Sequence, residues 1–189
     1  MNKIVLKSTS PRRKELLEKM GYDFIIKSFD VSELIDNNLT PEENVKRISL
    51  NKALAKKELF KDYIQIGCDT IVVLDNKIYG KPKDLKDARC MLELFSGKMH
   101  QVMSGLCVIY NDKIYNEVII SNVYFKRLSD KDIDDYLATK ESLGKAGAYA
   151  IQGIGAKLVE KYEGSLNNII GLPTERLEEI IGEINGMEN

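Results

Sequence analysis

At 189 residues the chain is long enough for one good core, or for two small lobes that share a sheet. A hydrophobic content of 43% and a charged content of 30% describe an ordinary globular protein and exclude a disordered or fibrous one. With a net charge of −1 the chain lacks the broad excess of positive charge of a general nucleic-acid or membrane-surface binder. Any anionic partner must therefore be bound by a local group of residues.

Alternating apolar patterns and turn signals predict strands and helices in mixed order along the chain. The first part of the chain predicts a strand at 4–6, a helix from about 11 that ends at Gly21, a strand at 22–29 and a helix from Thr40 to about Phe60. The middle part predicts a strand and hairpin at 63–80, a helix at 83–97 and a long antiparallel pair at 99–128 that turns at Asn111-Asp112. The last part predicts a helix from Ser129 to about Thr139, an irregular glycine-rich segment with a strand near 157–162, and a helix from Pro173. At least two hairpins predict a mixed sheet, not a purely parallel one.

The chain carries no signal for export or for a membrane. No apolar run approaches the ~18–20 residues of a membrane span, and the N-terminus has only three consecutive apolar residues. The three cysteines form no C-x-x-C pair, which suggests neither a disulfide framework nor a zinc site. We therefore expect a cytoplasmic protein with no membrane partner.

The first candidate site is the junction between the first predicted strand and the first predicted helix. Ser8 and Ser10 supply hydroxyl groups there, and Arg12 and Arg13 supply permanent positive charges. A helix N-terminus leaves backbone N–H groups unpaired and favours an anion such as phosphate. The alternative is a serine cap, a proline in the first turn and two solvated arginines.

A second candidate is Asp69, which interrupts an apolar run between Ile66 and Ile71. A buried carboxylate needs a partner, so this residue is a metal ligand, a general base or half of an ion pair. Lys52 on a helix, Lys81 in the Gly80-Lys81-Pro82 turn and Glu33 in a loop are weaker candidates, because single charged residues are usually solvated.

The glycine-rich segment 144–153 contains Gln152, whose amide offers one donor and one acceptor and could read a nucleobase edge. The small residues of this segment allow close approach of the backbone to a ligand or merely to a neighbouring strand. His100 is the sole histidine, so a Ser-His-Asp triad or a multi-histidine metal site is not expected; it is a packed or surface residue.

Taken together, these segments resemble the Maf family of nucleoside triphosphate pyrophosphatases over essentially the whole chain. The matching stretches are STSPRRKELL (8–17), NKA (51–53), GCDTIVV (67–73), GKP (80–82), SGKMHQVMSG (96–105), KAGAYAIQG (145–153) and GSLNNIIGLP (164–173). The resemblance implies a single α/β domain over residues 1–189, with a curved mixed sheet, flanking helices and two lobes around a central cleft.

The resemblance also implies an activity: hydrolysis of a nucleoside triphosphate to the monophosphate and pyrophosphate, with Mg²⁺ or Mn²⁺. Asp69 then corresponds to the proton acceptor and metal-linked acid, and Glu33 to a second acid near the metal. The implied phosphate-binding groups are Ser8, Ser10, Arg13, Lys52 and Lys81. A homodimer is implied as well, and a nucleotide-binding regulator of cell division or growth is the alternative function.

Three positions follow the division of the family by substrate. Arg12, Thr70 and Gln152 match the branch that acts on dTTP and UTP, whereas a sister branch associated with 7-methyl-GTP carries Trp, Gln and Glu there. Departures from the family pattern are Lys7 and Gly144, where a small residue and an acid are usual, together with Cys68, Ser104 and Ala150.

Overall fold

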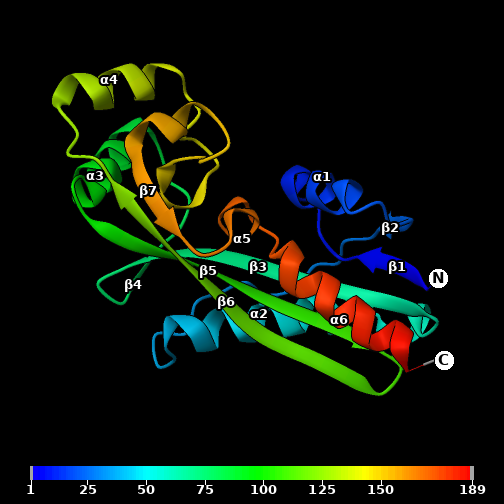
Figure 1. Cartoon of the computed structure of the whole chain (residues 1–189). Coiled ribbons are helices and arrows are strands. Elements are labelled where there is room, and N and C mark those ends of the chain that lie inside the picture. Colours follow the sequence, from blue (N-terminus) through cyan, green and yellow to red (C-terminus); the bar gives the residue numbers. More distant parts are fainter. Residues whose placement is uncertain (1, 188–189) are drawn as a thin grey trace. The chain divides into compact units, whose positions relative to one another are not determined.

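The computed structural model describes residues 2–187 of the chain. Over these residues the strands form a mixed seven-stranded sheet in the order β2-β1-β3-β5-β6-β7, with β4 also paired to β3 (Figure 1). Strand β1 pairs in parallel with β2 and β3, whereas the β3–β4 and β6–β7 pairs are antiparallel. The predicted α/β class with a mixed sheet and flanking helices is therefore confirmed.

The chain divides into two compact units. Unit 1 comprises Met1–Thr70, Ser104–Ile119 and Gly171–Asn189, and unit 2 comprises Ile71–Met103 and Ile120–Ile170. The elements within unit 1 are β1 (Lys3–Leu6), α1 (Pro11–Lys19), β2 (Phe24–Ile26), α2 (Pro41–Leu54), the 3₁₀ helix η1 (Lys57–Phe60) and α6 (Thr174–Gly186). Those within unit 2 are β4 (Lys77–Tyr79), α3 (Leu85–Phe95), α4 (Asp130–Ala138), η2 (Ala146–Ala148), η3 (Ile154–Leu158), β7 (Val159–Glu163) and α5 (Leu166–Ile170). Three long strands contribute residues to both units: β3 (Tyr63–Leu74), β5 (Met99–Tyr110) and β6 (Lys113–Phe125).

The helices of unit 1 begin where their capping residues predict. The side chain of Ser10 accepts a hydrogen bond from the backbone N–H of Arg13, with a proline in the first turn of α1. Thr40 and Glu43 form a reciprocal capping box at the start of α2. Gly21, with φ +77°, follows the end of α1, as its predicted C-terminal role requires.

The prediction that α2 continues to about Phe60 is wrong. The helix ends at Leu54, because Ala55 has an extended ψ of 119° and Lys56 takes the left-handed conformation with φ 51°. A separate 3₁₀ helix then runs from Lys57 to Phe60. The apolar spacing continues across this break, so the sequence pattern alone does not reveal it.

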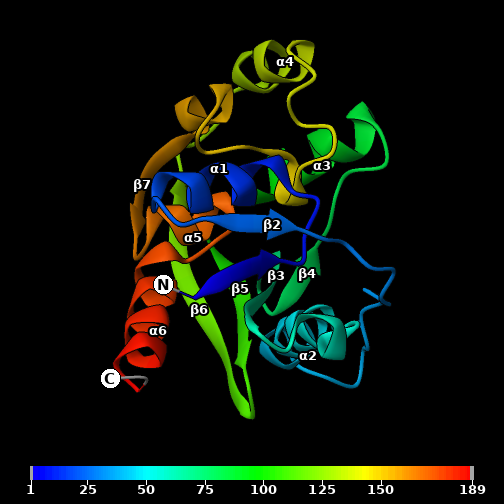
Figure 2. The ribbon, with the colours of Figure 1, turned by 90° about the vertical axis from the view of Figure 1, so that its right-hand side faces the viewer.

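Within unit 1, α2 and α6 cover opposite faces of the sheet (Figures 1 and 2). The apolar face of α6 buries Leu177, Ile180 and Ile184. A bidentate ion pair between Arg176 and Glu117, with N–O distances of 2.7 and 2.8 Å, joins α6 to β6. Among the helices of residues 2–187, none has the length and apolar character that crossing a bilayer requires.

In unit 2 the hairpin between β3 and β4 turns at Asp75 and Asn76, both with positive φ, as residues of a two-residue turn must be. Helix α4 begins with a capping box between Ser129 and Asp132, at the predicted place. The glycine-rich segment is more ordered than predicted: besides β7 it forms two 3₁₀ helices and the short helix α5.

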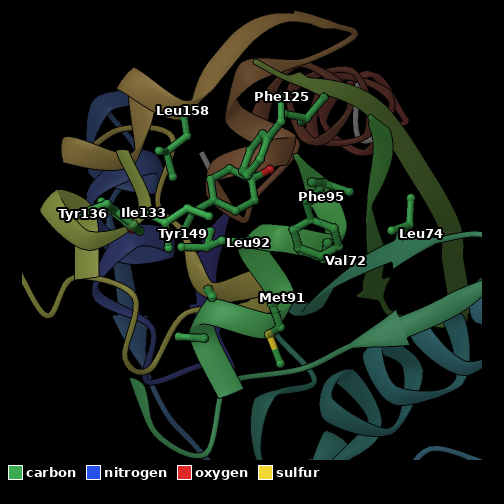
Figure 3. Close-up of a cluster of buried hydrophobic side chains, with 14 of the residues drawn as sticks. Val72, Leu74, Met91, Leu92, Phe95, Phe125, Ile133, Tyr136, Tyr149 and Leu158 are labelled. Atoms are coloured by element: carbon green, nitrogen blue, oxygen red, sulfur yellow. The ribbon is translucent and has the colours of Figure 1, made fainter. Parts of the chain in front are cut away.

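A cluster of buried aliphatic and aromatic side chains forms much of the core of unit 2 (Figure 3). The imidazole of His100 stacks on Phe95 with 4.7 Å between ring centroids and lies edge-on to Phe125 and Tyr149. Its Nε2 atom shares a 2.7 Å hydrogen bond with the hydroxyl group of Tyr149. His100 is therefore a packed residue of the core, and burial lowers its pKa to about 4.

This histidine makes the stability of the fold sensitive to acid. Its pKa is about 4 in the folded chain, against an ordinary value of about 6.5, so the unfolded chain binds a proton first. The stabilisation is complete above about pH 7, and about 3 kcal/mol of unfolding free energy is lost as the pH falls to 4. Urea unfolding at pH 7 and pH 4 measures this loss.

The matched control is His100→Phe, which keeps an aromatic ring in the stack and removes the titrating group. Carboxylates elsewhere in the chain titrate equally in both proteins, so the difference between the two pH profiles isolates His100. Identical profiles for the wild-type chain and the variant would contradict the assignment.

Candidate functional site

The loop between β1 and α1 is organised around two serine side chains. The Oγ atom of Ser8 accepts a 3.2 Å hydrogen bond from the backbone N–H of Ser10. Ser10 in turn caps α1, at 3.4 Å from the backbone nitrogen of Arg13. This arrangement places two hydroxyl groups beside the positive end of a nine-residue helix, which is a favourable place for an anion.

The guanidinium group of Arg13 joins this loop to two distant segments of unit 1. Its Nε donates to the carbonyl oxygen of Gly171 at 2.8 Å, and its two terminal nitrogens donate to the hydroxyl groups of Ser8 at 3.2 Å and Thr70 at 3.1 Å. The residue is only 9% exposed. Arg13 therefore fixes the loop in place and keeps its positive charge beside the serines.

Two residues of this network, Ser104 and Gly171, have no role assigned from sequence. The hydroxyl groups of Thr70 and Ser104 lie 2.8 Å apart, and the carbonyl oxygen of Gly171 also accepts from the hydroxyl group of Thr70 at 3.3 Å. The glycine has φ +137°, a conformation that residues with a Cβ rarely adopt. The sequence signal at this place is the stretch Gly171-Leu172-Pro173, and it does not indicate that its backbone binds Arg13.

The Arg12 side chain follows Pro11 in the first turn of α1 and is half-buried. Burial lowers the pKa of its guanidinium from the ordinary value, and the neighbouring charge of Arg13 lowers it further. A second cation therefore lies at the same helix N-terminus, in an environment that penalises its charge unless an anion is present.

The second part of the site is an ion triad in unit 1. The Nζ atom of Lys52 lies 2.8 Å from a carboxylate oxygen of Asp69 and 2.7 Å from one of Glu33. The side chains of Lys52 and Asp69 are 12% and 14% exposed, whereas that of Glu33 is 59% exposed. Of the alternatives for Asp69, the ion pair is therefore present, and the structure brings Lys52 and Glu33 to the same place.

Helix α2 can bring Lys52 to β3 because Gly67 has no side chain. A Cβ at that position would lie 2.4 Å from the carbonyl oxygen of Ser49 and 2.5 Å from the backbone nitrogen of Ala53. Strand and helix are thus in backbone contact on either side of Lys52 in the sequence. Asp69 lies two residues beyond Gly67 on the same strand, so its side chain is on the same face and within reach of the lysine.

The loop that carries Glu33 is held against α2. Asn44 accepts a 2.8 Å hydrogen bond from the backbone of Asp36 and donates to its carbonyl oxygen at 2.9 Å. Arg47 donates to the carbonyl oxygen of Leu34 at 2.6 Å. These bonds from α2 explain how an exposed loop residue keeps its place beside Lys52.

The remaining predicted residues, Lys81 and Gln152, belong to unit 2 and are both exposed. The Gly80 carbonyl oxygen, directly before Lys81, accepts a 3.1 Å hydrogen bond from the backbone of Gly147. The loop after Gln152 is held by Glu141, which accepts hydrogen bonds from the backbone N–H groups of residues 154 and 155 at 2.9 and 2.8 Å. Within unit 2, the lysine turn is therefore bound directly to the glycine-rich segment that leads to Gln152.

The donor set of the triad fits a hard divalent cation. Two carboxylates and one ammonium leave an excess of negative charge at this place. No group of three or more His, Cys, Asp or Glu side chains suited to a metal ion occurs within residues 2–187. Because Mg²⁺ is commonly held by one or two carboxylates together with substrate phosphates, Asp69 and Glu33 suit it without further protein ligands.

Comparison with known proteins finds relatives that match nearly the whole chain. A family model described as Maf-like protein matches residues 3–184 of the chain. A dTTP/UTP pyrophosphatase of Clostridioides difficile (strain 630) is 47% identical over 180 residues, covering 94% of this chain and 93% of the relative. Proteins of the same name from Hydrogenovibrio crunogenus and Bacillus thuringiensis subsp. konkukian are 41% and 42% identical over 185 residues each, covering 97% and 98% of this chain and 96% and 97% of the relatives.

Proposed function

Since the chain belongs to the Maf-like protein family, we propose that it hydrolyses dTTP and UTP to the nucleoside monophosphate and pyrophosphate. The names of its relatives support this substrate class. The observation that carries the proposal is the ion triad in which Lys52 binds both Asp69 and Glu33, because it combines an acid that can accept a proton with a cation that can bind phosphate.

The triphosphate is bound at the N-terminus of α1. Ser8 and Ser10 supply hydroxyl groups there, and Arg12 supplies a positive charge. Burial disfavours the charge of Arg12, and a bound anion offsets that cost. Arg13 stabilises the loop through Gly171 and Thr70 and adds its charge to the same place. Lys81, from unit 2, is the further phosphate-binding group that the family resemblance assigns.

Asp69 and Glu33 would hold a divalent cation, Mg²⁺ or Mn²⁺. When bound, such a cation neutralises the charge of the phosphate oxygens and of the departing pyrophosphate. The two carboxylates are already directed at one point by their common partner Lys52. The two carboxylates themselves fix that point in the middle of β3 and beside α2.

Asp69 accepts the proton of the attacking water. The attacking water adds to the α-phosphorus, its bond to hydrogen breaks as the carboxylate of Asp69 takes the proton, and the bond to the β-phosphate breaks to release pyrophosphate. In the structure the ammonium of Lys52 binds this carboxylate. Phosphate oxygens compete for the same ammonium, so substrate binding draws Lys52 toward the phosphates and leaves Asp69 able to accept the proton.

Preference for a pyrimidine base rests on Arg12, Thr70 and Gln152. The amide group of Gln152 offers a donor and an acceptor, which matches the edge of uracil or thymine. Thr70 is already hydrogen-bonded to Arg13 and paired with Ser104, so it acts on the base through the position of these neighbours. Homodimer formation and a cytoplasmic location are parts of the same proposal.

The experiment is an assay of pyrophosphate release from a panel of canonical and modified nucleoside triphosphates, with and without Mg²⁺ or Mn²⁺. We expect the highest kcat/KM for dTTP and UTP and loss of turnover after chelation of the metal. Micromolar binding of these nucleotides without release of pyrophosphate would instead favour the nucleotide-binding regulator. Light scattering of the same sample gives the molar mass and tests the dimer.

A further inference from the structure

The side chain of Lys7 lies in the interior of unit 1, directly before the serine loop. It is 3% exposed, whereas lysine is rarely buried to this degree without partners. Its Nζ atom has three oxygen partners: the carbonyl oxygens of Ala53 at 2.5 Å and Ala55 at 2.7 Å, and the side-chain oxygen of Gln65 at 2.7 Å. Lys7 therefore has a hydrogen-bond acceptor for each of its three N–H donors.

The ammonium form matches these partners in number and in charge. Burial lowers the pKa of Lys7 to about 8, so at pH 7 the group carries three N–H donors for three acceptors. Its charge also lies over the rings of Phe29 and Phe60, at 5.9 and 5.6 Å from their centroids.

The two carbonyl groups that Lys7 binds belong to the C-terminal end of α2. The last carbonyl groups of a helix lack partners within the helix, and a cation there also complements the helix dipole. The backbone leaves the helical conformation at Ala55 and turns left-handed at Lys56, so Lys7 binds at the point where α2 ends. Lys52 lies in this last turn, adjacent to Ala53.

Gln65 connects the same ammonium to β3. Its side-chain nitrogen donates to the carbonyl oxygens of Lys57 at 3.2 Å and Phe60 at 3.0 Å, which lie in η1 after the end of α2. The backbone of Lys7 itself donates to the carbonyl oxygen of Ile66 on β3 at 2.9 Å. Lys7 thereby ties the last turn of α2 and the segment beyond it to the strand that carries Asp69.

We propose that Lys7 is a positioning residue of the phosphate-handling site: by binding the carbonyl oxygens of Ala53 and Ala55 it holds Lys52 opposite Asp69. The inference rests on the proposed function, since it assigns to Lys7 an effect that passes through Lys52. It adds a residue that touches neither substrate nor metal. Its loss lets the last turn of α2 move, and small displacements of a catalytic cation are costly in rate.

The test is a double-mutant cycle of Lys7→Met and Lys52→Ala, with kcat and KM for dTTP measured at pH 7. Methionine keeps the apolar part of the side chain and removes the ammonium. We expect Lys7→Met to lower kcat/KM roughly tenfold. If the effect passes through Lys52, the double variant is no slower than Lys52→Ala alone; independent, merely structural effects would instead multiply.

The matched control is Lys3→Met, an exposed lysine at the start of β1, the strand that ends just before Lys7, for which kcat/KM stays within twofold. Lys7→Ala, which removes most of the side chain, serves as a second variant if Lys7→Met does not fold. An active wild-type chain with unchanged kcat/KM in both Lys7 variants, or multiplying losses in the cycle, would overturn the positioning role alone. A wild-type chain without turnover would overturn the proposed function. In that case the binding of inorganic pyrophosphate is measured instead, and equal affinities of the wild-type chain and Lys7→Met would overturn the positioning role too.

Discussion

The Asp69→Asn variant is expected to release pyrophosphate from dTTP and UTP more slowly than the wild-type chain, by a factor on the order of 10²–10⁴. Asparagine has nearly the same shape as aspartate and can still accept a hydrogen bond from Lys52, but its amide cannot take a proton from water. The negative charge that complements Lys52 and a divalent cation is lost as well. A coupled assay of pyrophosphate at saturating nucleotide measures the change.

The control for this variant is Asp62→Asn, which removes the same charge from an exposed position just before β3. Its turnover should equal that of the wild-type chain. Circular dichroism and the urea midpoint establish that Asp69→Asn is folded. A folded variant with more than a tenth of the wild-type rate would remove Asp69 from the role of proton acceptor.

A second large effect is expected for Gly67→Ala, this time on stability. The added Cβ would meet backbone atoms of Ser49 and Ala53 at 2.4 and 2.5 Å, and backbone atoms cannot rotate away as a flexible side chain can. Helix α2 must therefore move off the sheet, at a cost of about 3 kcal/mol or more of unfolding free energy. Because Lys52 moves with the helix, pyrophosphate release should fall too.

Gly182→Ala provides the comparison, since a Cβ at this position of α6 meets no atom within 4 Å. Alanine is the better helix former, so this variant should gain about 0.5–1 kcal/mol. Urea unfolding of the three proteins separates the two cases. An unchanged urea midpoint for Gly67→Ala would show that α2 and β3 are not in the close contact described.

Local chemistry explains which parts of the fold could be predicted from sequence. The capping residues Ser10, Thr40 and Ser129 mark helix starts because their partners lie only three residues away. The end of α2 could not be predicted, since it depends on contacts with distant segments. The bonds from Lys7 to Ala53 and Ala55, for example, span 46 and 48 residues.

The same distinction holds for the site. An aspartate within an apolar run requires a partner, and the ion pair with Lys52 is one of the three roles that this reasoning left open for Asp69. The carbonyl oxygen of Gly171, in contrast, lies 158 residues from its partner Arg13. A backbone acceptor has no sequence signature of its own, so only the folded chain reveals this bond.

That bond also bears on how the fold of unit 1 forms. Its two partners lie 158 residues apart, and the chain between them contains all of unit 2. Contacts of such long sequence separation form slowly, because closing the loop between them costs conformational entropy. The serine loop can therefore take up the geometry described only once the segment at Gly171 has come to lie beside Arg13.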